Sequence, residues 1–127
     1  MSRIVLDSGA LIALERNDRV LWGALKLAAS RSADVLVPTA ALAQVWRGTP
    51  VQTQLGRALS YCVLAPFDPV ARAVGELCGR TRTTDICDAH VAIVAAIRGD
   101  VLYTSDPRHL SRLLSAFGGR APAVVLC

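Results

Sequence analysis

The sequence predicts one α/β domain, residues 1–127, with a mostly parallel central sheet and helices on both faces. The chain has 127 residues, which is enough for one hydrophobic core and too short for two. Hydrophobic residues make up 53% of the chain, which excludes a disordered protein. Short apolar runs alternate with helical patterns along the whole length, as expected for a parallel sheet covered on both sides.

In the first part of the chain, β-branched apolar runs predict strands, and apolar side chains at helical spacing predict helices. Asp18 suits a helix N-cap, because its side chain can accept hydrogen bonds from free backbone N–H groups. Pro38 ends the second strand, and Gly48-Thr49-Pro50 ends the helix after it. The elements expected here are a strand at 3–6, a helix at 10–16, a helix from the Asp18 N-cap to about Ser30, a strand at 35–37 and a helix at 39–47.

The second part of the chain continues the alternation. Asp68-Pro69 and Asp106-Pro107 each predict a helix start, because aspartate suits the N-cap and proline the first helical position. A polar loop at 80–84 precedes a strongly apolar helix. The elements expected here are a helix at 51–59, a strand at 61–65, a helix from Asp68 to about Gly79, a helix at 85–98, a strand at 101–103, a helix from Asp106 to about Phe117 and a strand at 124–126.

No segment predicts membrane insertion. A spanning helix needs about 18 or more apolar residues without charge, and the longest uncharged stretch, 35–46, is interrupted by Pro38 and Gln44. Asp7 falls inside what would be the hydrophobic region of a signal peptide. We therefore expect a soluble, cytoplasmic protein with no membrane partner. Its four cysteines have no CxxC spacing, so we expect them to be reduced and not to bind zinc.

The basic residues are almost all arginine. The net charge is +4, and Lys26 is the only lysine among 14 basic residues. Because arginine can bind phosphate through two N–H groups at once, a nucleic-acid partner explains this composition. A GC-rich genome, which favours arginine codons, explains it equally well, and composition alone does not separate the two.

Several enzyme classes lack their motifs. The chain has no GxGxxG or GxxxxGK[ST] loop for a nucleotide, no GxSxG nucleophile turn and no HExxH zinc motif. A receiver-like phospho-acceptor domain needs a lysine after its last strand, whereas Lys26 lies in an early helix. His90 points away from the helix face of Asp88, two residues earlier, and His109 sits beside Arg108 at the start of the last helix. We interpret both as solvated or half-buried histidines, with contact to a ligand as the alternative.

Aspartates follow the predicted strands where a ligand site is expected. Asp7 comes directly after the first strand and Asp106 after the fourth, and the carboxyl ends of parallel strands meet at one edge of a sheet. Asp85 and Asp88 share one face of a helical first turn. Each suits an N-cap, but several carboxylates in one crevice repel one another unless a divalent cation is bound. Oxygen ligands favour Mg²⁺ or Mn²⁺, which without a nucleotide loop points to phosphodiester hydrolysis.

Four stretches of the chain match one known family. They are IVLDSGALIAL (4–14), VPTAALAQVWRG (37–48), TDICDAHVA (84–92) and TSD (104–106). In this order and spacing they resemble the PIN-domain ribonucleases, specifically the VapC-type toxins of VapBC (type II) toxin–antitoxin pairs. The resemblance implies an endoribonuclease that uses Mg²⁺, with Mn²⁺ as an alternative ion. A water activated by the metal would hydrolyse transfer or ribosomal RNA, with the 3′ oxygen as the leaving group.

Carried over residue by residue, the resemblance implies that Asp7, Asp88 and Asp106 are catalytic residues and metal ligands. Asp85 is an auxiliary group or an alternative ligand. The acidic position that the family places on the helix after the second strand is Gln44 here. An amide brings no charge, which leaves two alternatives. The protein is a ribonuclease with a weaker metal site, or a PIN-like module that binds RNA or an antitoxin without efficient cleavage.

The resemblance also implies partners. Three arginines are candidates for contacts with RNA phosphates, Arg82 first and then Arg47 and Arg108. A homodimer and a cognate antitoxin are implied as well. The apolar first two helices, including Trp22, would supply part of the antitoxin surface. The alternative is that Trp22 and Trp46 are ordinary core residues.

Overall fold

The computed structural model describes residues 2–127 as five strands and seven α-helices. The strands are β1 (Ile4–Leu6), β2 (Val35–Pro38), β3 (Val63–Ala65), β4 (Val101–Thr104) and β5 (Ala123–Leu126). The helices are α1 (Ser8–Glu15), α2 (Arg19–Ser30), α3 (Thr39–Val45), α4 (Thr53–Leu59), α5 (Ala71–Thr81), α6 (Ile86–Arg98) and α7 (Pro107–Phe117). Short 3₁₀ turns at Pro50–Gln52 and Asp68–Val70 precede α4 and α5.

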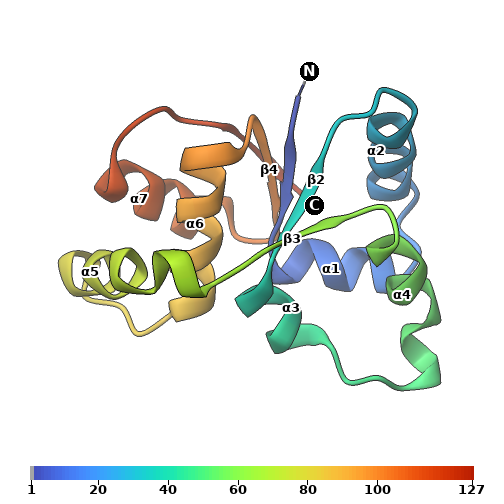
Figure 1. The fold of residues 1–127 in the computed structure, drawn as a ribbon, viewed down its shortest axis with the longest axis horizontal. Coiled ribbons are helices and arrows are strands. Elements are labelled where there is room, and N and C mark those ends of the chain that lie inside the picture. The colour runs from blue at the N-terminus through green and yellow to red at the C-terminus, as the bar shows by residue number, and fades with distance from the viewer. Residues whose placement is uncertain (1) are drawn as a thin grey trace.

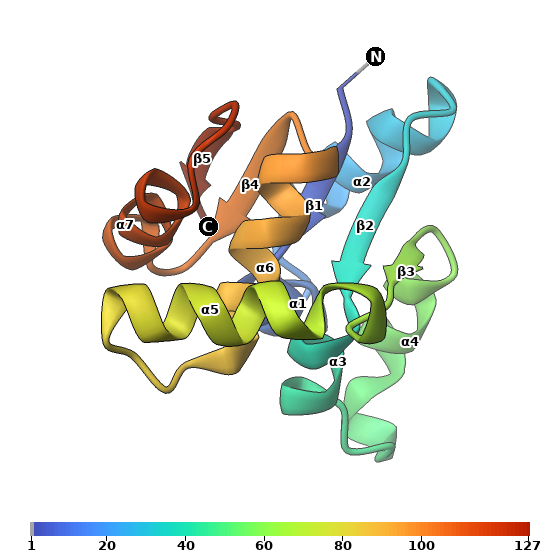
Figure 2. The same ribbon diagram turned by 60° about the vertical axis from the view of Figure 1, so that its left-hand side comes forward.

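The strands form one fully parallel sheet between two groups of helices. Figure 1 shows α1, α2 and α4 on one side of the sheet and α5, α6 and α7 on the other, with α3 beyond the lower end of β2. Figure 2 shows α6 lying across the centre of the sheet. The predicted α/β fold class, with helices on both faces, is confirmed.

The strand order, β3-β2-β1-β4-β5, places the topological switch point between β1 and β4. Val5 of β1 is paired with Leu36 of β2 on one side and with Leu102 of β4 on the other. Open parallel sheets bind ligands in the crevice at the carboxyl ends of the two strands at such a point. Asp7 and Asp106 follow these two strands, so the sheet brings both to the same edge.

The core is built from the central strands and α6. Every residue of β1 and β2 is buried, and α6 contributes a continuous buried run from Ala89 to Ala96. A helix this apolar needs partners on several sides, and α6 packs on α3, α5 and α7 as well as on the sheet. The start of α6 is therefore held firmly in place. Within residues 2–127, no helix combines the length and apolar character needed to cross a bilayer.

The differences from the predicted elements have local causes. The first helix begins two residues early, because the Asp7 side chain caps it by accepting the Ala10 N–H. Residues 51–59 are a 3₁₀ turn followed by α4, since Pro50 starts the turn. The predicted Asp68 N-cap is wrong. Asp68 is the first residue of a 3₁₀ turn and makes no capping hydrogen bond, and α5 starts only at Ala71.

Candidate metal centre

Asp7 is a buried carboxylate held between two neighbouring strands. Asp7 directly follows β1, and only 3% of the residue is exposed. Oδ1 accepts the Ala10 N–H at 2.8 Å, and Oδ2 accepts the hydroxyl of Thr104 at the end of β4. Burial raises the pKa of Asp7, and these hydrogen bonds oppose the rise.

Thr104 links Asp7 to Asp106. Its hydroxyl donates to Asp7 and accepts the Asp106 backbone N–H at 2.9 Å. Asp106 in turn caps α7 by accepting the His109 N–H at 3.2 Å. Sequence reasoning included Thr104 only as part of the TSD stretch. Its role as a buried link depends on the pairing of β1 with β4, which no local pattern reveals.

Asp85 and Asp88 lie at the N-terminus of α6. Asp85 caps the helix by accepting the Asp88 N–H at 3.0 Å. The pKa of Asp88 is raised to about 7, first by burial and then by the hydrogen bond and negative charge of Asp85. The charges of Asp7 and Asp106 add to this rise. Asp88 is therefore surrounded by the negative charge of three other aspartates, which a bound cation would offset.

His109 joins these two aspartates, which the sequence analysis did not anticipate. Its Nε2 lies 3.6 Å from Oδ2 of Asp85 and 3.5 Å from Oδ2 of Asp88. Ligand atoms of the three residues lie within 4.8 Å of one another, an arrangement that no other group of three such side chains among residues 2–127 shares. Asp7 and Asp106 lie outside this group of three. One local signal existed: His109 follows Asp106, the N-cap of α7, by three residues and so lies in the first turn of that helix.

Gln44 lies beside the segment that carries Asp7. Its Oε1 accepts the Ser8 hydroxyl at 2.7 Å, and Ser8 directly follows Asp7. The nearby acid Glu15 is engaged elsewhere, because its Oε1 accepts a hydrogen bond from Nε2 of the buried Gln52 at 2.8 Å. The structure thus places the neutral amide of Gln44 beside Ser8, and Glu15 is bound to Gln52 instead.

Gly9 sets the separation between α1 and the loop after β4. A Cβ added to Gly9 would lie 2.0 Å from Oγ of Ser105, so a larger residue cannot fit unless the loop moves. The same loop carries Asp106. Close packing at this point therefore helps to hold Asp7 and Asp106 in a fixed relation.

The three arginines predicted to contact RNA have different surroundings. Arg82 is exposed and ends α5 in a left-handed conformation, with φ 55°, three residues before Asp85. Arg108 is exposed in the first turn of α7, next to His109. Arg47 folds back on α3, where its Nη1 donates to the carbonyl of Trp46 at 2.7 Å. Arg47 is therefore partly engaged by its own helix end.

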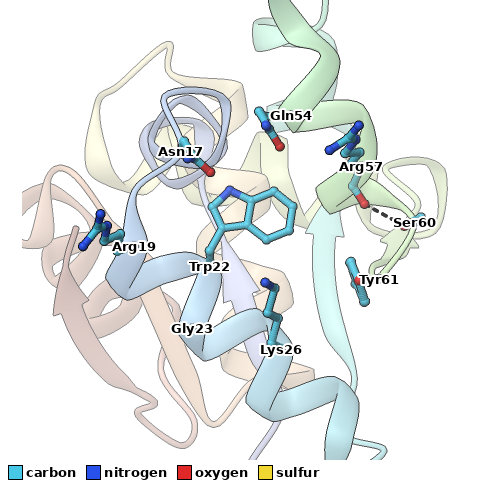
Figure 3. A pocket seen from close by; sticks show the side chains of 9 residues that line it. All are labelled: Asn17, Arg19, Trp22, Gly23, Lys26, Gln54, Arg57, Ser60 and Tyr61. Atoms are coloured by element: carbon cyan, nitrogen blue, oxygen red, sulfur yellow. Dashed lines mark hydrogen bonds between the residues drawn. The ribbon is translucent and has the colours of Figure 1, made fainter.

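A hollow of about 530 Å³ lies between α2 and α4, away from the aspartates. Figure 3 shows Trp22 and Lys26 of α2 facing Arg57 of α4 and the following Tyr61. Trp22 packs edge-on against Tyr61, with ring centroids 6.4 Å apart, and its indole N–H donates to a backbone carbonyl. The lining is rich in cations and holds no carboxylate; it consists of Asn17, Arg19, Trp22, Gly23, Lys26, Gln54, Arg57, Ser60 and Tyr61.

Comparisons with known proteins concern the fold. No protein-family model matches the sequence, and no curated protein matches it. Among solved structures, the chain is similar to the crystal structure of VapBC2 from Rickettsia felis bound to a DNA fragment from their promoter. The TM-score is 0.69 over 98% of both chains, at 16% sequence identity. The chain therefore has the VapC-type PIN-domain fold that its sequence resemblance predicted.

Proposed function

We propose that this protein is a divalent-metal-dependent endoribonuclease and acts as the toxin of a toxin–antitoxin pair. The observation that carries the proposal is the gathering of aspartates at the switch point of a VapC-type fold, where the pKa of Asp88 is raised to about 7. Carboxylates with this excess of negative charge fit Mg²⁺ or Mn²⁺, which prefer oxygen ligands. The donor set and its charge are therefore suited to a divalent cation.

In this proposal Asp7, Asp88 and Asp106 hold the ion, Asp85 is an auxiliary group or an alternative ligand, and Gln44 is auxiliary. A divalent cation supplies two things when bound: it lowers the pKa of water and offsets charge on a scissile phosphate. Asp7 needs little reorganisation for this task, because Ala10 and Thr104 already fix its carboxylate. Loss of the 3′ oxygen as leaving group would give products with a 5′-phosphate and a 3′-hydroxyl.

RNA would approach the aspartates through its phosphate groups. Arg82 and Arg108 are exposed, and each lies within three residues of a member of the acidic group. They are the arginines best placed to bind the RNA backbone on either side of the scissile phosphate. Arg47 is the weaker candidate because its guanidinium binds carbonyls of its own helix.

The test is RNA cleavage by matched aspartate variants. We expect the wild type to cleave transfer or ribosomal RNA with Mg²⁺ or Mn²⁺, and Asp7→Asn and Asp88→Asn each to slow cleavage by about 100-fold or more. Asp34→Asn is the control, because Asp34 is exposed at the amino end of β2, at the opposite edge of the sheet. Cleavage that survives EDTA and both site variants would contradict the proposal.

The alternative is a PIN-like module that binds RNA or an antitoxin without efficient cleavage. The observation that favours it is the amide of Gln44 beside Ser8, where the family has a negative charge. Gln44→Glu separates the two functions. Activity gained by this variant in an otherwise inert protein supports the module, whereas robust turnover by the natural sequence excludes it.

The hollow between α2 and α4 is the surface we assign to the antitoxin. Its cations and aromatic rings suit an acidic segment that also carries an apolar side chain. We expect Lys26→Glu with Arg57→Glu to weaken co-purification with the product of the adjacent reading frame and to leave RNA cleavage unchanged. Unchanged co-purification would remove the antitoxin from this surface. The proposed homodimer is tested separately by light scattering of the purified protein.

A further inference from the structure

The imidazole of His109 lies against the two carboxylates at the start of α6. Its Nε2 is nearly equidistant from one oxygen of Asp85 and one oxygen of Asp88, at 3.6 and 3.5 Å. The side chains are accessible but not loose: 21% of His109, 42% of Asp85 and 18% of Asp88 are exposed. An ion from solvent can therefore reach all three.

The contacts of His109 with Asp85 and Asp88 are ion-pair contacts and are too long for hydrogen bonds. An N–H···O bond spans about 2.7–3.2 Å between heavy atoms, and both contacts of His109 exceed this range. Two donor atoms that each lie about 2.1 Å from one octahedral ion are about 3.0 Å apart at 90°, about half an ångström closer than here. A small inward movement of the side chains would place all three around one ion.

The backbone that carries the imidazole is held by the start of α7. Pro107 begins the helix, and Asp106 accepts the backbone N–H of His109 at 3.2 Å, which fixes the first turn. One turn later, Arg112 donates to the carbonyl of Thr81, which joins α7 to the end of α5. Leu110 and Leu113 are buried beneath the same turn. The position of His109 is thus set by packing and caps that exist without an ion.

We propose that His109 Nε2 is a direct ligand of the divalent cation, together with Asp85 and Asp88, and that this nitrogen makes the site prefer Mn²⁺ over Mg²⁺. Imidazole binds first-row transition ions well, whereas Mg²⁺ strongly favours oxygen ligands and octahedral hydration. The inference rests on the proposed function for the cation itself. It adds the residue that selects the ion and gives Asp85 a direct role.

The experiment uses Mn²⁺ alone and needs no RNA. Pulsed electron paramagnetic resonance of the protein–Mn²⁺ complex detects a directly bound nitrogen through its nuclear coupling. We expect a histidine nitrogen coupling in the wild type that changes with ¹⁵N-histidine labelling and disappears in His109→Asn. His90 is the only other histidine of the chain, so it serves as an internal control. A coupling that is absent, or that persists in His109→Asn, would overturn the proposal.

Calorimetry gives the second readout. We expect Mn²⁺ to bind the wild type at least tenfold more tightly than Mg²⁺, and His109→Asn to lower the Mn²⁺ affinity about tenfold with a much smaller effect on Mg²⁺. His109→Gln and thermal melting check that the fold is intact. Equal losses for both ions would overturn the proposal. Metal binding through His109 without RNA cleavage would contradict only the ribonuclease, and metal-dependent cleavage without a nitrogen coupling would contradict only the role of His109.

Discussion

In the folded protein, ionisation of the Asp88 carboxyl is electrostatically unfavourable. Its carboxyl is partly buried and lies near three other aspartates, so its pKa rises from 3.8 to about 7. Between these two pH values the native protein binds a proton that the unfolded chain does not. The stabilising contribution of that proton is complete below pH 3.8 and is lost as the pH rises through about 7. In the metal-free protein, Asp88 therefore lowers stability at neutral and alkaline pH.

Asp88→Asn isolates this effect. In metal-free buffer, we expect the unfolding free energy of the wild type to fall relative to that of Asp88→Asn between pH 5 and pH 8, because only the wild type must ionise the carboxyl. At pH 8 the variant should be more stable by on the order of 2 kcal/mol, since one pKa unit corresponds to about 1.4 kcal/mol and solvent screens part of the effect. Urea unfolding at several pH values measures the difference.

The titration of His90 does not affect the comparison of the wild type with Asp88→Asn. His90 is fully buried, and the expectation of a solvated or half-buried residue is wrong, because α6 is buried continuously from Ala89 to Ala96. Burial lowers the pKa of His90, so protonation of this residue destabilises the native protein below its usual pKa near 6.5. This effect is common to the wild type and Asp88→Asn and cancels in the difference. Parallel pH profiles for the two proteins would show that Asp88 has no raised pKa.

At the scale of residues, the sequence predicted which aspartates form the candidate site. It did not predict their contacts with Thr104 and His109. Asp7, Asp85, Asp88 and Asp106 stand at strand ends and helix starts, where a position along the chain already implies a place in the fold. Their roles as ligands remain proposals. Thr104 and His109 acquire their contacts only through the packing of distant elements, so the residue types alone could not indicate them.

At the scale of elements, the site depends on how closely α1 approaches the loop after β4. Gly9 permits this approach because it has no Cβ, and Ser105 fills the space next to it. The two segments carry Asp7 and Asp106, which the Thr104 hydroxyl also connects. A change at this contact should therefore alter the site without touching any of the aspartates.

Gly9→Ala tests this contact. The added Cβ would overlap with Ser105, so we expect a loss of about 1–3 kcal/mol in stability and a weaker affinity for Mn²⁺. Ser105→Gly in the same chain removes the overlapping Oγ and Cβ and should restore much of both. Thermal melting and calorimetry measure the two effects. A Gly9→Ala protein with unchanged stability and metal affinity would show that the approach is not constrained.

Most elements were predictable because their ends carry clear local signals. Asp18, Asp85 and Asp106 cap α2, α6 and α7 through their own side chains, as their positions predicted. The errors fall where a proline starts a 3₁₀ turn in place of a helix, as at Asp68-Pro69. Whether a 3₁₀ turn or an α-helix begins at such a proline depends on the direction in which the preceding strand ends. That direction is set by tertiary packing.

At the scale of the whole molecule, the strand order brings residues that are distant in the sequence together at one site. The alternation of strands and helices predicted a parallel sheet, but the order β3-β2-β1-β4-β5 follows from pairing that the sequence pattern does not specify. The switch point between β1 and β4 then collects negative charge in a chain whose net charge is +4. This separation, an acidic group at one edge of the sheet in a protein of positive net charge, would suit the proposed binding of a cation and a polyanion together.

The most direct test of the ribonuclease proposal is the chemistry of the cleaved ends. Purified protein, stripped of metal with EDTA and then given Mn²⁺, should cut a labelled transfer RNA and leave a 5′-phosphate and a 3′-hydroxyl, and Asp88→Asn should leave the RNA intact. A 2′,3′-cyclic phosphate, or cleavage that continues in EDTA, would contradict hydrolysis by a metal-activated water.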